Sequence, residues 1–217
     1  MKTTTSTLIA LLALITTLNA QTQKGDLYLG GNFGYFYSSD GNAESKSNSL
    51  IIGPSIDYYV KDNLACGFRI SYSGYSTTYT QNYSGTEVDL KNSSNLINFS
   101  PYIRLHGKLS DKVSCYGEAG LNFGFGKNTE ESYDIQNNST LKSKTGRMLY
   151  GIGISPGIWW NIKPKLALTF QYGSLYYYSS KYTPENDAED SYKTSTFNFS
   201  LNGNSLGIGL HYAICGK

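Results

Sequence analysis

The sequence predicts an all-β protein, namely an eight-stranded antiparallel up-and-down transmembrane β-barrel. The first observation behind this prediction is that apolar residues recur at every second position, which is the period of a strand with one apolar face. The second is that short turns alternate with long polar segments along the chain, which is the order of a meander. The third is that the opposite strand faces hold mostly Gly and Ser, with few charges.

The first 20 residues, MKTTTSTLIALLALITTLNA, are predicted to be a signal peptide. They contain a charged start (Lys2), an apolar core and a small residue, Ala20, at the expected cleavage site. The apolar core is shorter than the roughly 20 residues that a membrane-spanning helix needs. The alternative is an N-terminal helix of the folded domain. The predicted organisation is a signal peptide over residues 1–20 and one β-barrel domain over residues 21–217.

Charge and cysteine content exclude several classes of function. The net charge is +2, and loss of residues 1–20 removes one lysine and leaves +1, which is too little for a nucleic-acid partner. The three cysteines, Cys66, Cys115 and Cys215, do not form a disulfide framework. Each lies in an apolar alternating segment, where a thiol acts as a small hydrophobic group. Because no Cys/His cluster has metal-ligand spacing, no metal or cofactor is predicted.

A hairpin motif that occurs three times predicts most of the strands. GPSIDYYVK (53–61), SPYIRLHGK (100–108) and SPGIWWNIK (155–163) share a Pro, an Ile two positions later and a Lys seven positions after the Pro. Each precedes a turn and a new alternating segment: LACGFRISY, VSCYGEAGLNF and LALTFQYGSLYY. DLYLGGNFGYFY before them and SLGIGLHYAI after them bring the count to eight. Because Pro lacks a ladder donor, a bulge or kink is predicted at Pro54, Pro101 and Pro156.

The connections at the other end of the strands are predicted to be long surface loops. They cover residues 38–48, 77–94, 127–146 and 179–196, and all are polar without an apolar period. Short turns at one end and long loops at the other are typical of outer-membrane barrels, in which the turns are periplasmic and the loops extracellular.

The apolar strand faces are predicted to point outward into lipid. A soluble secreted barrel that binds an apolar ligand would need the opposite phase. An arginine facing lipid at mid-depth would cost about 2–4 kcal/mol, whereas inside the barrel it can meet a carboxylate. The predicted lumen charge network is therefore Asp57, Arg69, Arg104 and Glu118. Two interpretations stay open: a salt-bridge plug in a narrow lumen, or an ion path through a small porin-like channel.

No catalytic site is predicted. The chain has two histidines, His106 and His211, and both map to the turn end, whereas the long polar segments hold none. A hydroxyl needs a nearby base to become a nucleophile, so both histidines are interpreted as residues of the lumen or its rim. Aromatic residues near the strand ends are predicted to form two interfacial girdles. These are Tyr58, Tyr59, Trp159 and Trp160 near the turns, and Tyr35, Phe36, Tyr37, Tyr176, Tyr177 and Tyr178 near the loops. A tyrosine-rich outer rim that binds sugar or protein is the alternative.

These features resemble the OmpA/OmpX-like eight-stranded outer-membrane β-barrel proteins, in the stand-alone form common in Bacteroidota. The resemblance rests on the signal peptide, LYLGGNFGYF, GPSIDYYVKDNLACGF and LGIGLHYAI, and covers residues 21–215. It implies an outer-membrane location, with lipid and lipopolysaccharide around the barrel. It also implies insertion by the barrel-insertion machinery, which reads a C-terminal aromatic residue; the last one here is Tyr212.

The expected function is a non-enzymatic structural or surface-interaction role through four long extracellular loops, whose ligand the sequence does not identify. The alternatives are a small porin-like channel and a soluble secreted ligand-binding barrel.

Overall fold

The computed structural model describes residues 22–40, 45–83, 86–134, 139–185, 190–200 and 206–215, so the predicted signal peptide lies outside the described residues. Among the described residues, no helix is both long and apolar enough to cross a membrane. The strands are β1 (Leu27–Asp40), β2 (Ser45–Lys61), β3 (Leu64–Tyr83), β4 (Thr86–Lys108), β5 (Val113–Asp134), β6 (Ser139–Lys163), β7 (Leu166–Tyr172), β8 (Ser174–Pro184), β9 (Tyr192–Ser200) and β10 (Leu206–Cys215).

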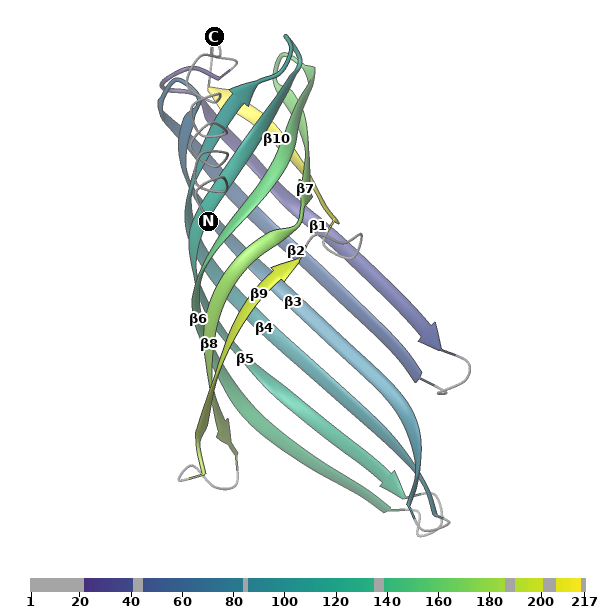
Figure 1. The fold of residues 1–217 in the computed structure, drawn as a ribbon. Coiled ribbons are helices and arrows are strands. Elements are labelled where there is room, and N and C mark those ends of the chain that lie inside the picture. The colour runs from purple at the N-terminus through teal and green to yellow at the C-terminus, as the bar shows by residue number, and fades with distance from the viewer. Residues whose placement is uncertain are drawn as a thin grey trace, which may run out of the picture.

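Antiparallel neighbours close these strands into a ring. The ring runs from β1 to β7 in chain order and then through β10, which pairs back with β1 (Figure 1). The predicted eight-stranded antiparallel barrel is therefore confirmed. We call the end with the tight turns after β2, β4 and β6 the base, and the opposite end the mouth.

The seventh barrel strand is interrupted by a glycine bulge. β6 pairs with both β7 and β8, and Gly173 between them has φ of 78°, a conformation that favours glycine. Gly157 pairs with Gln171 and Ile154 with Leu175, so the seventh strand carries one extra residue. Beyond the bulge, β8 pairs with β9, and this antiparallel pair lies in the mouth half on the β6 side, away from β1 (Figure 1).

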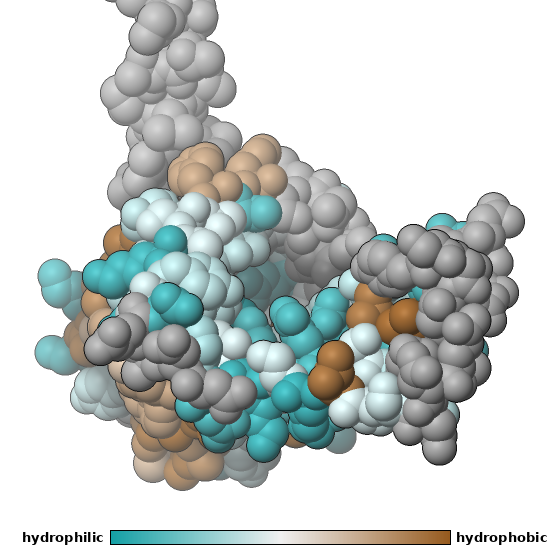
Figure 2. Space-filling model, turned by 90° about the horizontal axis from the view of Figure 1, so that it is seen from below, coloured by the Kyte–Doolittle hydropathy of each residue, from teal (hydrophilic) through white to brown (hydrophobic). Residues whose placement is uncertain are grey.

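The predicted phase, with apolar faces outward, is confirmed. Large apolar side chains are exposed along every strand of the ring, while the residues between them are buried and often polar; on β2, Ser55 and Asp57 alternate with Ile56 and Tyr58. A tilted strand needs about 9–11 residues to cross a membrane, and the exposed apolar residues of β4, for example, run from Ile97 to Leu105. Seen from the mouth, hydrophilic side chains line the hollow and hydrophobic ones gather on the outer wall (Figure 2).

The predicted bulges at the prolines are wrong for Pro54 and Pro101. Ile52 pairs with Tyr72 and Ser55 with Arg69, so the register of β2 and β3 is the same on both sides of Pro54. The β4–β5 register is likewise unchanged across Pro101. The missing N–H interrupts the ladder without inserting a residue. At Pro156 the bulge exists, but it lies in the facing strand, at Gly173.

The predicted long loops are mostly strands. β3, β4, β5 and β6 are 20, 23, 22 and 25 residues long and continue well beyond the apolar band. Polar cross-strand pairs connect these extensions: Thr80 donates a hydrogen bond to Asp89 (2.7 Å) and Ser94 to Asn128 (2.8 Å). Because both faces of the extensions meet water, they lack the apolar period that marks a strand in the sequence.

Candidate functional site

The structure brings the four charged residues of the predicted network together inside the barrel. Arg69 on β3 donates two hydrogen bonds to Glu118 on β5, with distances of 2.9 and 3.0 Å. Arg104 on β4 donates to Glu118 (2.8 Å) and to Asp57 on β2 (3.1 Å). Two guanidinium groups and two carboxylates thus form one neutral network that links four neighbouring strands.

Arg104 lies at the centre of this network and is enclosed by aromatic rings. Its guanidinium carbon lies 5.1 Å from the ring centroid of Tyr102, 5.0 Å from that of Tyr116 and 5.5 Å from that of Trp159. Cation–π contacts of this kind strengthen when water is excluded. The Tyr102 hydroxyl also donates a 2.6 Å hydrogen bond to Asp57. Charge pairing and ring stacking therefore hold the same side chain.

Inward glycines make room for the large side chains of the base. A Cβ built on Gly67 would lie 2.3 Å from the Tyr102 ring, and one on Gly157 would lie 2.3 Å from the Tyr116 ring. A Cβ on Gly30 of β1 would lie 2.3 Å from His211 Nδ1. His211 on β10 thus reaches over Gly30 to Asp57 on β2, with 3.1 Å between Nδ1 and Oδ2.

A layer of aromatic rings and histidines fills the lumen below the charge network. Trp159 is fully buried, with centroid distances of 5.3 Å to Tyr28, 5.1 Å to His106 and 4.7 Å to His211. The Tyr59 hydroxyl lies 2.9 Å from His106 Nε2. The girdle prediction is therefore wrong for Tyr59 and Trp159, whereas their neighbours Tyr58 and Trp160 do face outward, with 48% and 42% exposure.

The residues before β1 cover this layer from outside. The backbone N–H of Gly25 donates to the carbonyl of Tyr59 (2.9 Å), and the N–H of Asn63 donates to the carbonyl of Thr22 (3.2 Å). Thr22 is itself buried. The base of the lumen is therefore closed by side chains and by the segment that leads into β1.

One trio in the base has the order of a hydrolase triad. His211 lies between Asp57 and Thr169, with 3.4 Å from its Nε2 to the Thr169 hydroxyl. All three side chains are buried. The adjoining cavity, about 10 Å³, has room for about one water molecule.

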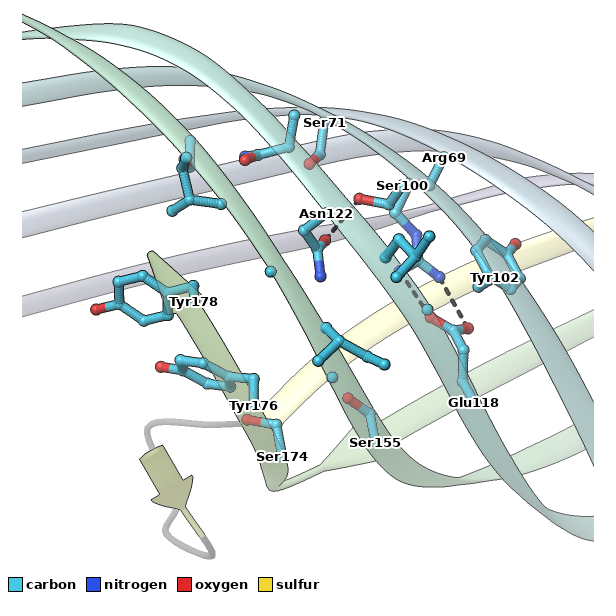
Figure 3. A pocket seen from close by; sticks show the side chains of 18 of the residues that line it. Arg69, Ser71, Ser100, Tyr102, Glu118, Asn122, Ser155, Ser174, Tyr176 and Tyr178 are labelled. Carbon is cyan, nitrogen blue, oxygen red and sulfur yellow. Dashed lines mark hydrogen bonds and ion pairs between the residues drawn. The ribbon is translucent and has the colours of Figure 1, made fainter. Parts of the chain in front are cut away.

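The mouth half of the lumen is hollow, with a cavity of about 480 Å³. Arg69, Glu118 and Tyr102 form its floor, and serines and asparagines line its wall (Figure 3). Tyr176 and Tyr178 of β8 line the cavity with stacked rings, 5.5 Å between centroids. The girdle prediction is therefore wrong for these two tyrosines as well. No group of three or more His, Cys, Asp or Glu residues within the described ranges could hold a metal ion.

Residues 6–213 match the model of the family described as "Outer membrane protein beta-barrel domain". The chain belongs to this family. The family and the outward apolar band together show that this barrel lies in the outer membrane.

Three solved structures with a similar fold are distant in sequence. Ail of Yersinia pestis is 13% identical, with 88% of this chain and 100% of that chain covered and a TM-score of 0.34. OprG of Pseudomonas aeruginosa is 14% identical, with 91% and 100% covered and a TM-score of 0.42. The protease OmpT of Escherichia coli is 10% identical, with 92% and 100% covered and a TM-score of 0.34. Comparison with curated proteins finds none that matches.

Several residues of this barrel's interior were not predicted as one site from the sequence. His211 lies in the lumen, one of the two places predicted for it, but its contact with Asp57 was not predicted, because it needs the ring closure that brings β10 within reach of β2 across β1. The alternation of strand faces predicts Trp159 inside the barrel together with Tyr102 and Tyr116, and the same rule could have placed Tyr59 there, since successive strand residues face opposite sides. No sequence signal indicated that Tyr102 would bind Asp57.

Proposed function

We propose that this outer-membrane barrel is a non-enzymatic protein that is closed to through-flow at its base and acts through its hollow mouth. The single observation that supports this function is the contrast along the lumen. Charged and aromatic side chains fill the base, whereas a cavity of about 480 Å³ occupies the mouth.

The charge network favours a plug over an ion path. An ion crossing the base would have to displace Arg104, whose side chain is 1% exposed and bound to both Asp57 and Glu118. Removing one partner of such a network leaves a buried charge without compensation, at a cost of about 3–5 kcal/mol. A cost of this size would slow each passage by about 10²–10⁴-fold relative to an open lumen, which supports a plug rather than a conducting path.

The surroundings of both histidines support a non-enzymatic role. His106 is held between Tyr59 and Ser114, and His211 between Asp57 and Thr169, and all of these side chains are buried below the cavity. A general base must come within hydrogen-bond reach of its substrate. Neither histidine lines the large cavity of the mouth.

The mouth is the end that would face outside the cell, because outer-membrane barrels have short periplasmic turns and longer extracellular segments. Here the extracellular segments would be strand extensions held by cross-strand pairs, which offer a firmer surface than loops. Lipid and lipopolysaccharide would surround the band, and the barrel-insertion machinery would be a partner during assembly only.

Single-channel recording in planar bilayers tests the closed base. The mature protein should insert as a folded barrel, which a heat-dependent shift in gel mobility verifies, and should give no steady conductance. A steady conductance from protein that shows the heat shift would overturn the proposal and favour the porin-like channel.

A further inference from the structure

We propose that the mouth cavity binds a small sugar that carries one anionic group, with its ring against Tyr176 and Tyr178 and its charge at Arg147. This inference rests on the proposed function, because it assigns a ligand class to the hollow mouth of a barrel closed below. The cavity of about 480 Å³ falls in the range of small-ligand sites, about 300–1,000 Å³.

The two tyrosines form an aromatic platform on one wall. Their rings are nearly parallel, with an interplanar angle of 28°. They come from β8 positions that pair with Gly151 and Gly153 of β6, where no side chain competes for the space. A Cβ built on Gly151 would lie 2.8 Å from the Tyr178 Cβ. The C–H face of a sugar ring packs well on such an electron-rich aromatic face.

The rest of the wall offers hydrogen-bonding groups that both donate and accept. Ser100 donates a 2.7 Å hydrogen bond to Asn122 Oδ1, and this leaves the Asn122 amide nitrogen turned to the open space (Figure 3). Ser155, Ser174 and Gln171 add two hydroxyls and a second amide. Hydroxyls and amides match the vicinal hydroxyls of a sugar, each of which also donates and accepts. An apolar platform opposite such a wall fits a molecule with one apolar face and polar edges.

Arg147 is the reason to expect an anionic group on the ligand. Arg69 and Glu118 neutralise each other in the cavity floor, so Arg147 on β6 gives the lining one positive charge in excess. Its guanidinium lies 3.3 Å from the Ser180 hydroxyl and 5.6 Å from the Tyr182 ring centroid. Among the described residues, no carboxylate forms an ion pair with it. It is therefore free to form charge-assisted hydrogen bonds to a carboxylate, sulfate or phosphate on the sugar.

Calorimetric titration of the mature barrel in detergent micelles tests this inference, with glucuronic acid as the anionic probe and glucose as the neutral one. We expect glucuronic acid to bind about tenfold more tightly than glucose, which corresponds to one charge-assisted contact. Arg147→Gln should abolish this preference, while Lys181→Gln, the same charge change on the outward face of β8, should keep it. Tyr176→Ala or Tyr178→Ala should lower the affinity for both sugars about tenfold. Tyr150→Ala on the outward face of β6 should leave both affinities unchanged.

Absence of binding by either probe to protein that shows the heat shift would overturn the inference and leave the closed barrel standing. Equal losses of sugar affinity in the cavity variants and in the outward-facing control variants would also overturn the inference. The conductance measurement is independent, since steady current through the wild-type protein would overturn the closed base whatever the sugars do.

Discussion

The base and the mouth of this barrel are lined by the same inward strand faces, but the base is filled with side chains and the mouth is hollow. In the base, inward glycines lie beneath large side chains, as Gly67 does beneath Tyr102 and Gly157 beneath Tyr116, so the rings cross the lumen and fill it. In the mouth, the inward residues are mostly Ser, Asn and Gly, and the two tyrosines lie along one wall. Strand number fixes the width of a barrel. Side-chain volume at each level then decides whether the lumen is filled or hollow.

The two regions also treat an inward arginine differently. Arg104 in the base is bound to two carboxylates and enclosed by three rings, whereas Arg147 in the mouth contacts a hydroxyl and one ring. The base therefore depends on each partner of a closed network, and the mouth keeps its charge available. Four substitutions test this contrast, and the first three each have a matched variant in the other region or on the outer face.

The largest effect is expected for Arg104→Leu. It leaves Asp57 and Glu118 buried with less compensation, so the free energy of unfolding should fall by about 3–5 kcal/mol. Urea unfolding of the barrel in lipid vesicles, followed by tryptophan fluorescence, measures this change. The matched variant Arg147→Leu should cost less than about 1 kcal/mol, because its contacts are few and near water. Equal losses for the two variants would mean that base and mouth do not differ in this way.

A second effect is expected for Tyr102→Phe, which removes the hydroxyl that donates to Asp57 over 2.6 Å. A hydrogen bond to a charged group contributes about 1.5–3 kcal/mol, and the same unfolding measurement should show a loss in this range. Tyr178→Phe in the mouth keeps the ring and should change stability by less than about 0.5 kcal/mol. If Tyr102→Phe leaves the free energy of unfolding unchanged, the network does not depend on this donor.

A third effect tests the packing of rings on glycines. Gly67→Ala puts a methyl group 2.3 Å from the Tyr102 ring, which Asp57 holds in place. Overpacking of this kind costs about 1–3 kcal/mol. Gly117→Ala is the control, because a Cβ there has no heavy atom within 4 Å. If both variants unfold at the wild-type urea concentration, the base is packed more loosely than the structure indicates.

The sequence predicted the ring of eight strands and the outward apolar face because both depend on a period of two and on turn positions, which are local. The prediction of strands from the sequence was wrong where that period is absent. The strand extensions toward the mouth are polar on both faces, so the stretch that contains Thr80 and Asp89 was interpreted as a loop. The Gly173 bulge did leave a signal, because apolar residues change from even positions (Leu166, Leu168) to odd ones (Leu175, Tyr177).

The interior site was predictable only in part, because its contacts depend on which strands become neighbours. Arg104 and Glu118 pair directly across β4 and β5, which the hairpin order implies. The contact between His211 and Asp57 needs both the closure of the ring and the absence of a side chain at Gly30. The stacked tyrosines of the mouth depend on the bulge that turns Tyr176 and Tyr178 inward.

The smallest effect is expected at the mouth, for Glu131→Gln in the β5 extension. Lys142 donates a hydrogen bond to Glu131 and holds the pKa of that carboxyl below its ordinary value. A depressed folded-state pKa stabilises the fold above the unfolded-state pKa, and this contribution is lost as the pH falls through the folded-state pKa. Because water and salt screen this pair, the urea midpoint of Glu131→Gln near neutral pH should match that of the wild type, and the two should also agree in acid. A loss of stability near neutral pH as large as that of Tyr102→Phe would show that ion pairs stabilise the mouth as strongly as the charge network stabilises the base. The two regions would then differ only in the volume of their inward side chains.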